Sequence, residues 1–115
     1  MGIFLVAEID GKVVGHAFLE PFPLKYLCHV VQLTIGIYHG FQEKGIGTCL
    51  MNELIKLAKE LITIEKIELN VRASNKRAIA LYKKLGFMDE GLFKNNIKIS
   101  ENHYIDDVLM ALVIK

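Results

Sequence analysis

The sequence lacks the features that place a chain in a membrane or in an oxidising compartment. Its longest apolar stretches are interrupted by His, Glu, Pro or Lys well before they reach the length that spans a bilayer. The short apolar run at the N-terminus is followed closely by Glu8 and Asp10, which is not the pattern of a signal peptide. Cys28 and Cys49 show no metal-ligand spacing, so we expect reduced thiols, no metal site and a cytoplasmic protein.

An excess of charge is missing as well. The formal net charge is +1, from 14 basic and 13 acidic side chains, and this balance gives no reason to expect a nucleic-acid or membrane partner. Repeats, low-complexity segments and linkers are also absent from the sequence. A chain of 115 residues with 52% hydrophobic residues therefore predicts one domain, residues 1–115, with a substantial core.

The N-terminal third is rich in strand signals. β-rich runs over residues 3–9 and 12–19 flank Asp10-Gly11, the strongest short signal for a hairpin turn. A third strand is predicted over residues 29–38, apolar on much of both faces, as is typical of a central strand. It contains Gly36, and a glycine inside a strand marks a bulge or a close backbone approach.

Helical periodicity follows. An amphipathic helix is predicted between Gly45 and Ile62, with one apolar stripe made of Leu50, Leu54, Leu57, Ala58 and Leu61. A strand containing Ile67, Leu69 and Val71 comes next. A second helix, capped by Ser74 or Asn75, runs to Leu85, and Gly86 stands where a left-handed stop is expected.

Two closing strands over 91–100 and 103–113, joined by a turn at Glu101-Asn102, complete the order β-β-β-α-β-α-β-β. This order predicts an α+β fold in which two helices flank a central mixed, mostly antiparallel sheet.

The segment from Gln42 to Thr48 joins the third strand to the first helix and carries two glycines, Gly45 and Gly47. The first N–H groups of a helix have no intrahelical partner, and the helix dipole there favours negative charge, which suits a pyrophosphate. A dinucleotide fingerprint would need a glycine at Leu50, and a P-loop would need Lys44 to follow Gly45. Without further evidence, the glycines could equally serve only to form a tight turn.

Two longer patterns make this segment more specific. Ile35-x-Ile37-x-x-x-Phe41-Gln42-x-x-Gly45-x-Gly47 resembles the acetyl-CoA-binding motif of the GNAT superfamily of N-acetyltransferases, a hydrophobic strand followed by Q/R-x-x-G-x-G/A. Asn75-x-x-Ala78-x-x-Leu81-Tyr82-x-x-x-Gly86-Phe87 is similar to that family's second motif. The resemblance covers essentially the whole chain. Within the family it is nearest to bacterial members that acetylate amino acids, polyamines or protein N-termini.

The resemblance implies acetyl-CoA as co-substrate and assigns its contacts. The backbone of Ile35 and Ile37 would bond the pantetheine amides beside Gly36. The N–H groups from Gln42 to Thr48 would hold the pyrophosphate, and Asn75 is either a helix cap or a further contact. The implied binding residues are Ile35, Ile37, Gln42, Glu43, Lys44, Gly45, Ile46, Gly47, Thr48, Asn75 and Tyr82. Lys44 would add a charge-assisted contact, and we expect Glu43 to face solvent.

Catalytic roles also follow from the resemblance. An N–H near Ile37 would stabilise the oxyanion, and Tyr82 would protonate the departing thiolate. The structural alternative for Tyr82 is a core tyrosine with a bonded hydroxyl. For the base that accepts the amine proton we favour His29, with Glu20, His103 and Asp106 as alternatives and with no dedicated base as a further one. His29 could equally be a strand-edge residue.

Members of this family usually begin with a strand and one or two helices before the hairpin that starts here at Ile3. That difference is compatible with a truncated sequence, with completion by a partner chain, or with a non-catalytic acetyl-CoA-binding module. The predicted function is transfer of an acetyl group from acetyl-CoA to a primary amine of a small molecule or a protein N-terminus, by direct attack in a ternary complex. A homodimer is a further expectation from similar proteins.

Overall fold

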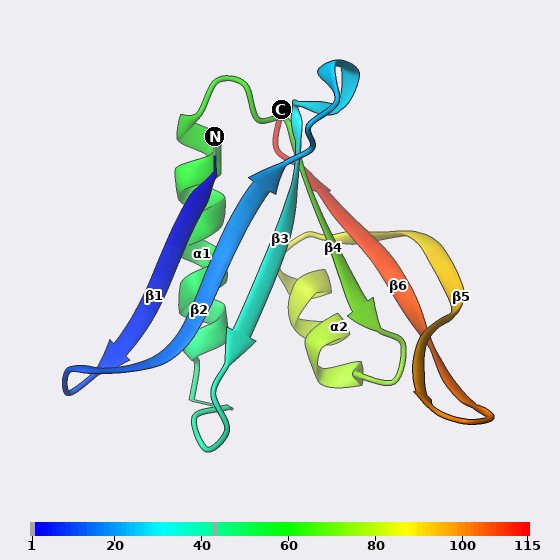
Figure 1. The fold of residues 1–115 in the computed structure, drawn as a ribbon. Coiled ribbons are helices and arrows are strands. Elements are labelled where there is room, and N and C mark those ends of the chain that lie inside the picture. Colours follow the sequence, from blue (N-terminus) through cyan, green and yellow to red (C-terminus); the bar gives the residue numbers. More distant parts are fainter. Residues whose placement is uncertain (1, 43) are drawn as a thin grey trace. The chain divides into compact units, whose positions relative to one another are not determined.

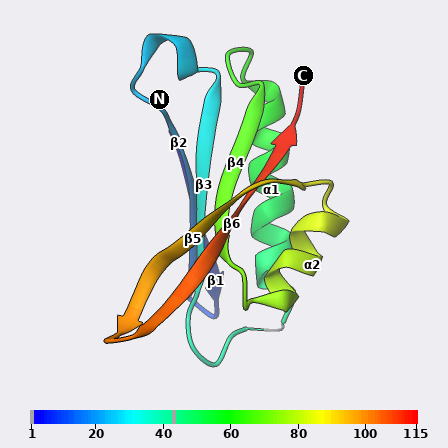
Figure 2. The same cartoon turned by 90° about the vertical axis from the view of Figure 1, so that its right-hand side faces the viewer.

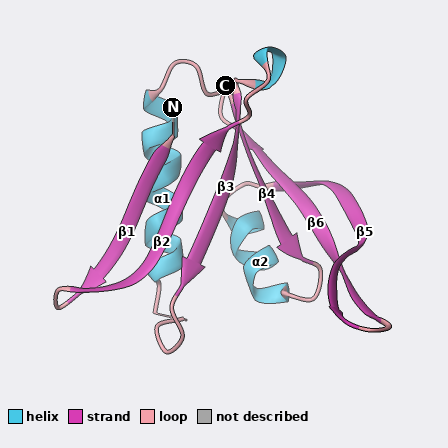
Figure 3. Cartoon of the chain, in the orientation of Figure 1, coloured by secondary structure: helices cyan, strands magenta, loops and turns pink. Residues whose placement is uncertain are grey.

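The computed structural model describes residues 2–42 and 44–115 and contains the predicted elements in the predicted order (Figure 1). Figure 3 distinguishes the strands from the helices. The elements are β1 (Ile3–Ile9), β2 (Lys12–Pro21), a 3₁₀ turn η1 (Lys25–Leu27), β3 (Val30–Ile37), α1 (Ile46–Glu60), β4 (Lys66–Arg72), α2 (Lys76–Lys84), β5 (Met88–Ser100) and β6 (His103–Val113). β5 starts three residues before the predicted strand. No helix within the described ranges is long and apolar enough to cross a membrane.

The chain forms two compact units, and the first comprises Met1–Ile67 with Ile114–Lys115. Its strands β1 and β2 form the predicted hairpin. Asp10 and Gly11 in the turn have φ angles of 51° and 79°, the two positive values that a type I′ turn requires. β3 pairs with β2, and both pairings are antiparallel. Helix α1 lies along one side of these strands, as Figure 2 shows.

The core of this unit lies between the three strands and α1. A Cβ placed on Gly15 of β2 would lie 3.6 Å from the Ile46 side chain, so the odd-numbered positions of β2 face α1. Ala17 and Leu19 accordingly are buried. From α1, the buried side chains are Leu50, Met51, Leu54, Ile55 and Ala58.

The predicted stripe on α1 was right for three positions and wrong for two. Leu57 and Leu61 are only half-buried, while Met51 and Ile55 are buried in their place. Residues 51, 54, 55 and 58 follow the spacing of one helical face, and position 57 lies at the rim of that face. Contact with the strands therefore decides which positions of the apolar face are fully buried.

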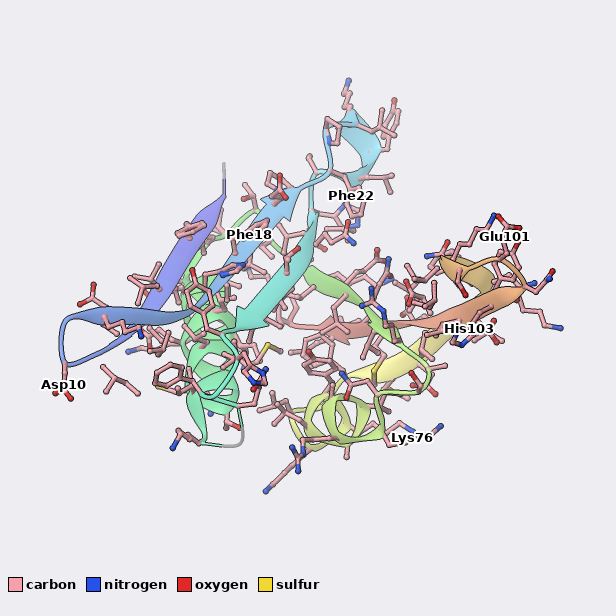
Figure 4. All side chains as sticks on the ribbon, turned by 60° about the horizontal axis from the view of Figure 1, so that its bottom comes forward. Asp10, Phe18, Phe22, Lys76, Glu101 and His103 are labelled. Carbon is pink, nitrogen blue, oxygen red and sulfur yellow. The ribbon has the colours of Figure 1, made fainter. Side chains whose placement is uncertain are left out.

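The second unit comprises Glu68–Val113. Its β5–β6 hairpin is antiparallel, and β6 lies between β5 and β4 in the strand order. The tip of the hairpin, between Glu101 and His103 (labelled in Figure 4), turns at Asn102, whose φ is 62°. Gly86 ends α2 with a φ of 105°, as predicted for a left-handed stop. Leu69, Val71 and Met110 are among the buried residues of this unit.

Candidate functional site

The turn between β3 and α1 is held by the side chain of Gln42. Its Oε1 accepts a hydrogen bond from the Gly40 N–H at 3.3 Å, and its Nε2 donates to the Ile37 carbonyl at 3.4 Å. The Phe41 N–H donates to the Tyr38 carbonyl at 3.0 Å. These bonds give Gln42 a structural role that its place in the sequence motif did not reveal. The side-chain amide shapes the turn that leads into the helix.

The N-terminus of α1 is open. Its N-cap is Gly45, with a φ of 78°, and among residues 2–42 and 44–115 no side chain caps the helix or places an acid in its first turn. The first helical bond runs from the Cys49 N–H to the Gly45 carbonyl at 3.0 Å. The N–H groups of Ile46, Gly47 and Thr48 therefore have no intrahelical acceptor, and they favour an anion.

Space in front of these N–H groups comes from the two glycines. A Cβ added at Gly45 or at Gly47 would meet no heavy atom of the described residues within 4 Å, so these residues leave the helix end uncovered. Lys44 is exposed beside it and can approach an anion. Glu43 lies outside the described residues, and its expected orientation toward solvent stays a prediction.

Hydrogen bonds at the two ends of β3 show where its peptide groups point. The Tyr38 N–H donates to the Val14 carbonyl at 2.8 Å, and the Val30 carbonyl accepts from Phe22 at 3.3 Å. Even-numbered residues therefore turn their peptide groups toward β2, because successive residues of a strand alternate. The peptide groups of Ile35 and Ile37 consequently face away from β2, and their bonds to pantetheine stay a prediction.

Gly36 marks a close approach and not a bulge in the β2–β3 pairing. The register runs through the Gly36–His16 pair without a break. A Cβ built on Gly36 would lie 2.9 Å from Cε1 and 3.3 Å from Nε2 of His16, so the imidazole occupies the space where a side chain at position 36 would stand. Sequence reasoning missed His16, because nothing local pairs position 16 with position 36.

Asn75 and Tyr82 belong to the second unit. Asn75 Oδ1 accepts from the Ala78 N–H at 3.1 Å, so Asn75, and not Ser74, is the N-cap of α2. The Tyr82 ring is 8% exposed and lies 6.0 Å from the Phe87 ring, between centroids. Burial raises the pKa of Tyr82 above its ordinary value of 10.0.

The Tyr82 hydroxyl, however, is not hydrogen-bonded to any described residue of the core. Among the described residues no hydrogen bond to it is formed, and no buried side-chain nitrogen or oxygen lacks a partner. The oxygen therefore retains contact with solvent. The ring is buried, as the structural alternative expected, but no described residue bonds the hydroxyl, and the role of Tyr82 as the thiolate acid stays a prediction.

His29 lies at the opposite end of β3 from the turn. It is half-buried, and its carbonyl accepts from the N–H groups of Glu65 and Lys66 at 2.9 and 3.3 Å. Eight residues separate it from Ile37, roughly 26 Å along an extended strand. Its role as a base stays a prediction. Of the alternatives, Asp106 has a carboxylate oxygen that accepts from the Asn95 N–H at 2.8 Å.

A family model described as "Acetyltransferase (GNAT) family" matches residues 2–87. The chain is 35% identical over 109 residues to the L-amino acid N-acetyltransferase AaaT of Escherichia coli, covering 95% of the chain and 67% of that protein. It is also similar to a solved acetyltransferase of the GNAT family from Streptococcus pneumoniae, with a TM-score of 0.93 and 30% identity.

The structural match extends over 99% of the chain and 67% of the Streptococcus pneumoniae protein. A phosphinothricin acetyltransferase from Sinorhizobium meliloti, solved in complex with acetyl-CoA, matches at a TM-score of 0.85 and 26% identity, covering 96% of the chain and 60% of that protein. The chain thus spans about two thirds of the length of the proteins it matches. The predicted fold class, a mixed six-strand sheet with two helices in the order β-β-β-α-β-α-β-β, is confirmed.

Proposed function

Because the chain belongs to the acetyltransferase (GNAT) family, we propose that it transfers an acetyl group from acetyl-CoA to a primary amine. The proposed acceptor is an amino group of a small molecule, such as an amino acid, or of a protein N-terminus. The observation that carries the proposal is the uncapped N-terminus of α1, where Gly45 and Gly47 leave three N–H groups open to an anion. A pyrophosphate is the anion that this substrate offers.

The peptide groups of β3 supply the second part of the proposal. Those of Ile35 and Ile37 face away from β2, and they would bond the pantetheine amides on that side of β3. The Ile37 N–H would donate to the oxygen of the thioester carbonyl as negative charge develops on it. Fixed N–H donors of this kind commonly contribute about 3–4 kcal/mol to the stabilisation of such a transition state.

Tyr82 is proposed as the group that protonates the departing thiolate. Its raised pKa keeps the phenol protonated at neutral pH, and its hydroxyl has no hydrogen-bond partner among the described residues. Transfer proceeds by direct attack of the neutral amine in a ternary complex, so the C–N bond forms as the C–S bond breaks. The proton released by the amine needs an acceptor, for which His29 is the candidate from sequence.

Acetyl-CoA binding and turnover are tested separately. Binding is measured as stabilisation against urea at increasing acetyl-CoA, and turnover as loss of thioester absorbance with a panel of amino acids, polyamines and peptides. Thiol-reactive dyes are avoided because Cys28 and Cys49 are free and exposed. Stabilisation with turnover supports the proposal, and stabilisation without turnover on any amine favours the acetyl-CoA-binding module. Absence of stabilisation at millimolar acetyl-CoA would refute both.

We also propose a cellular location and an oligomeric state. A cytoplasmic location agrees with free, exposed Cys28 and Cys49, which form no disulfide with each other. A homodimer is proposed from the behaviour expected of similar proteins. Fractionation of cells and light scattering of the purified chain test these two proposals.

A further inference from the structure

We propose that His16 accepts the proton of the acceptor amine. This inference rests on the proposed function, and it names a residue of the first unit that no sequence motif identifies. It is carried by the juxtaposition of the His16 imidazole with Gly36, which lies near the end of β3 between two residues whose peptide groups face the side proposed for pantetheine.

The imidazole lies over β3 although His16 belongs to β2. A Cβ on Gly36 would be 2.9 Å from the ring's Cε1, so only glycine leaves room for the ring at this position. A glycine costs a strand both conformational entropy and side-chain packing. At position 36 it allows an imidazole to reach the backbone between Ile35 and Ile37.

The spacing of strands in a sheet indicates how far the His16 imidazole lies from the acceptor amine. Neighbouring extended chains in a sheet lie about 4.8 Å apart, so a pantetheine chain bound to the peptide groups that face away from β2 lies about 5 Å from the β3 axis. An amine placed against its thioester is then within reach of a ring nitrogen lying over Gly36, directly or through one water. His29, at the other end of β3, has no comparable position.

Aromatic rings hold the imidazole in place. The ring centroids of Phe4 and Phe18 lie 6.4 and 6.3 Å from that of His16, with interplanar angles of 6° and 14°. The Tyr38 ring meets it edge-on at 6.3 Å and 67°. Phe4 and Tyr38 are also 65% and 48% exposed. Exposed aromatic faces attract an ammonium group, so they favour the charged form of the substrate arriving beside the base.

The ring nitrogens of His16 are not committed elsewhere. Across the described part of the chain, neither hydrogen-bonds or ion-pairs with a protein group. The ionisable side chains on the elements around the ring are Glu8 on β1, Lys12 and Glu20 on β2, and Tyr38 after β3. None of these four bonds to the imidazole. A half-buried, clamped and unpartnered imidazole has the properties of a general base.

A ring nitrogen of His16 takes one proton from the ammonium, and the freed electron pair forms the C–N bond with the thioester carbonyl carbon. The C–S bond breaks, its electron pair leaves with sulfur, and the thiolate takes a proton from the acid proposed for it, Tyr82. The nitrogen, positively charged after the attack, loses its second proton, which restores that acid, and the imidazolium releases its proton to solvent. The net products are an N-acetylated amine, CoA and one proton.

The test is His16→Gln in the full chain, with kcat/KM measured across pH for the best acceptor of the panel. We expect a loss of about 100-fold or more near neutral pH, with acetyl-CoA affinity unchanged within twofold. The acidic limb of the wild-type profile should be replaced by a steady rise with pH, as the free amine fraction alone then sets the rate. Equal kcat/KM and an unchanged profile in His16→Gln would overturn the inference.

Matched variants separate this inference from its alternatives. His39→Gln, an exposed histidine in the following turn, should retain wild-type turnover. Loss of the acidic limb in His29→Gln, with the limb intact in His16→Gln, would assign the base to His29 and refute the proposal. Gly36→Ala should lower turnover by displacing the imidazole. The same substitution should lower turnover much less in the His16→Gln background. Failure of the wild-type chain to bind acetyl-CoA would instead refute the proposed function.

Discussion

The N-terminus of α1 offers a substitution whose effects on stability and on binding have opposite signs. Gly47 is the second residue of the helix, and a Cβ there meets nothing within 4 Å. Gly47→Glu therefore brings no clash. It gains about 0.5–1 kcal/mol because glycine is a poor helix former, and about 0.3–1 kcal/mol because an acid at a helix N-terminus complements the dipole.

The free Gly47→Glu variant should accordingly be more stable than the parent by about 1–2 kcal/mol. The same carboxylate stands where the pyrophosphate is proposed to bind, so the variant should lose its response to acetyl-CoA. For the parent, a ligand at 100 times its dissociation constant adds about 2.7 kcal/mol to the free energy of unfolding. Urea denaturation with and without acetyl-CoA measures both quantities.

Gly47→Ala is the matched control. It should gain about 0.5–1 kcal/mol in the free state and keep the full response to acetyl-CoA, since a methyl group adds no charge. A Gly47→Glu variant that is still stabilised by acetyl-CoA would place the anion elsewhere. A free Gly47→Glu variant less stable than the parent would contradict the open space described in front of the helix.

Three other substitutions test single features. Gly45→Ala should lower the free energy of unfolding by about 1–2 kcal/mol, because φ at this N-cap is 78°; full stability in urea would contradict that backbone conformation. Asn75→Ala should cost about 1 kcal/mol by removing the cap of α2, whereas Ser74→Ala should change stability little; equal losses would refute the assignment. Tyr82→Phe should lower turnover at unchanged acetyl-CoA affinity. Because the pKa of Tyr82 is raised, the unfolded chain ionises first above about pH 10, so stability falls there in the parent and falls less in the variant.

Much of the fold could be predicted because its signals are local. Asp10-Gly11 needs only its own two φ angles to form the β1–β2 turn, and both are positive as expected. Gly86 ends α2 for the same reason. The two motifs predicted the family, and the match over residues 2–87 confirmed it.

The sequence by itself therefore determined the order of the elements, the turns and the open, glycine-bounded start of α1, since each depends on residues within a few positions of one another. Only the tertiary structure decided which positions of the apolar face of α1 are fully buried, how the Gln42 amide folds back onto the turn, and that His16 lies over Gly36. These outcomes depend on strand register and on packing between distant segments. A shift of one residue in the β2–β3 register would move the imidazole to the other face of β3, and residue spacing along the chain does not encode that choice.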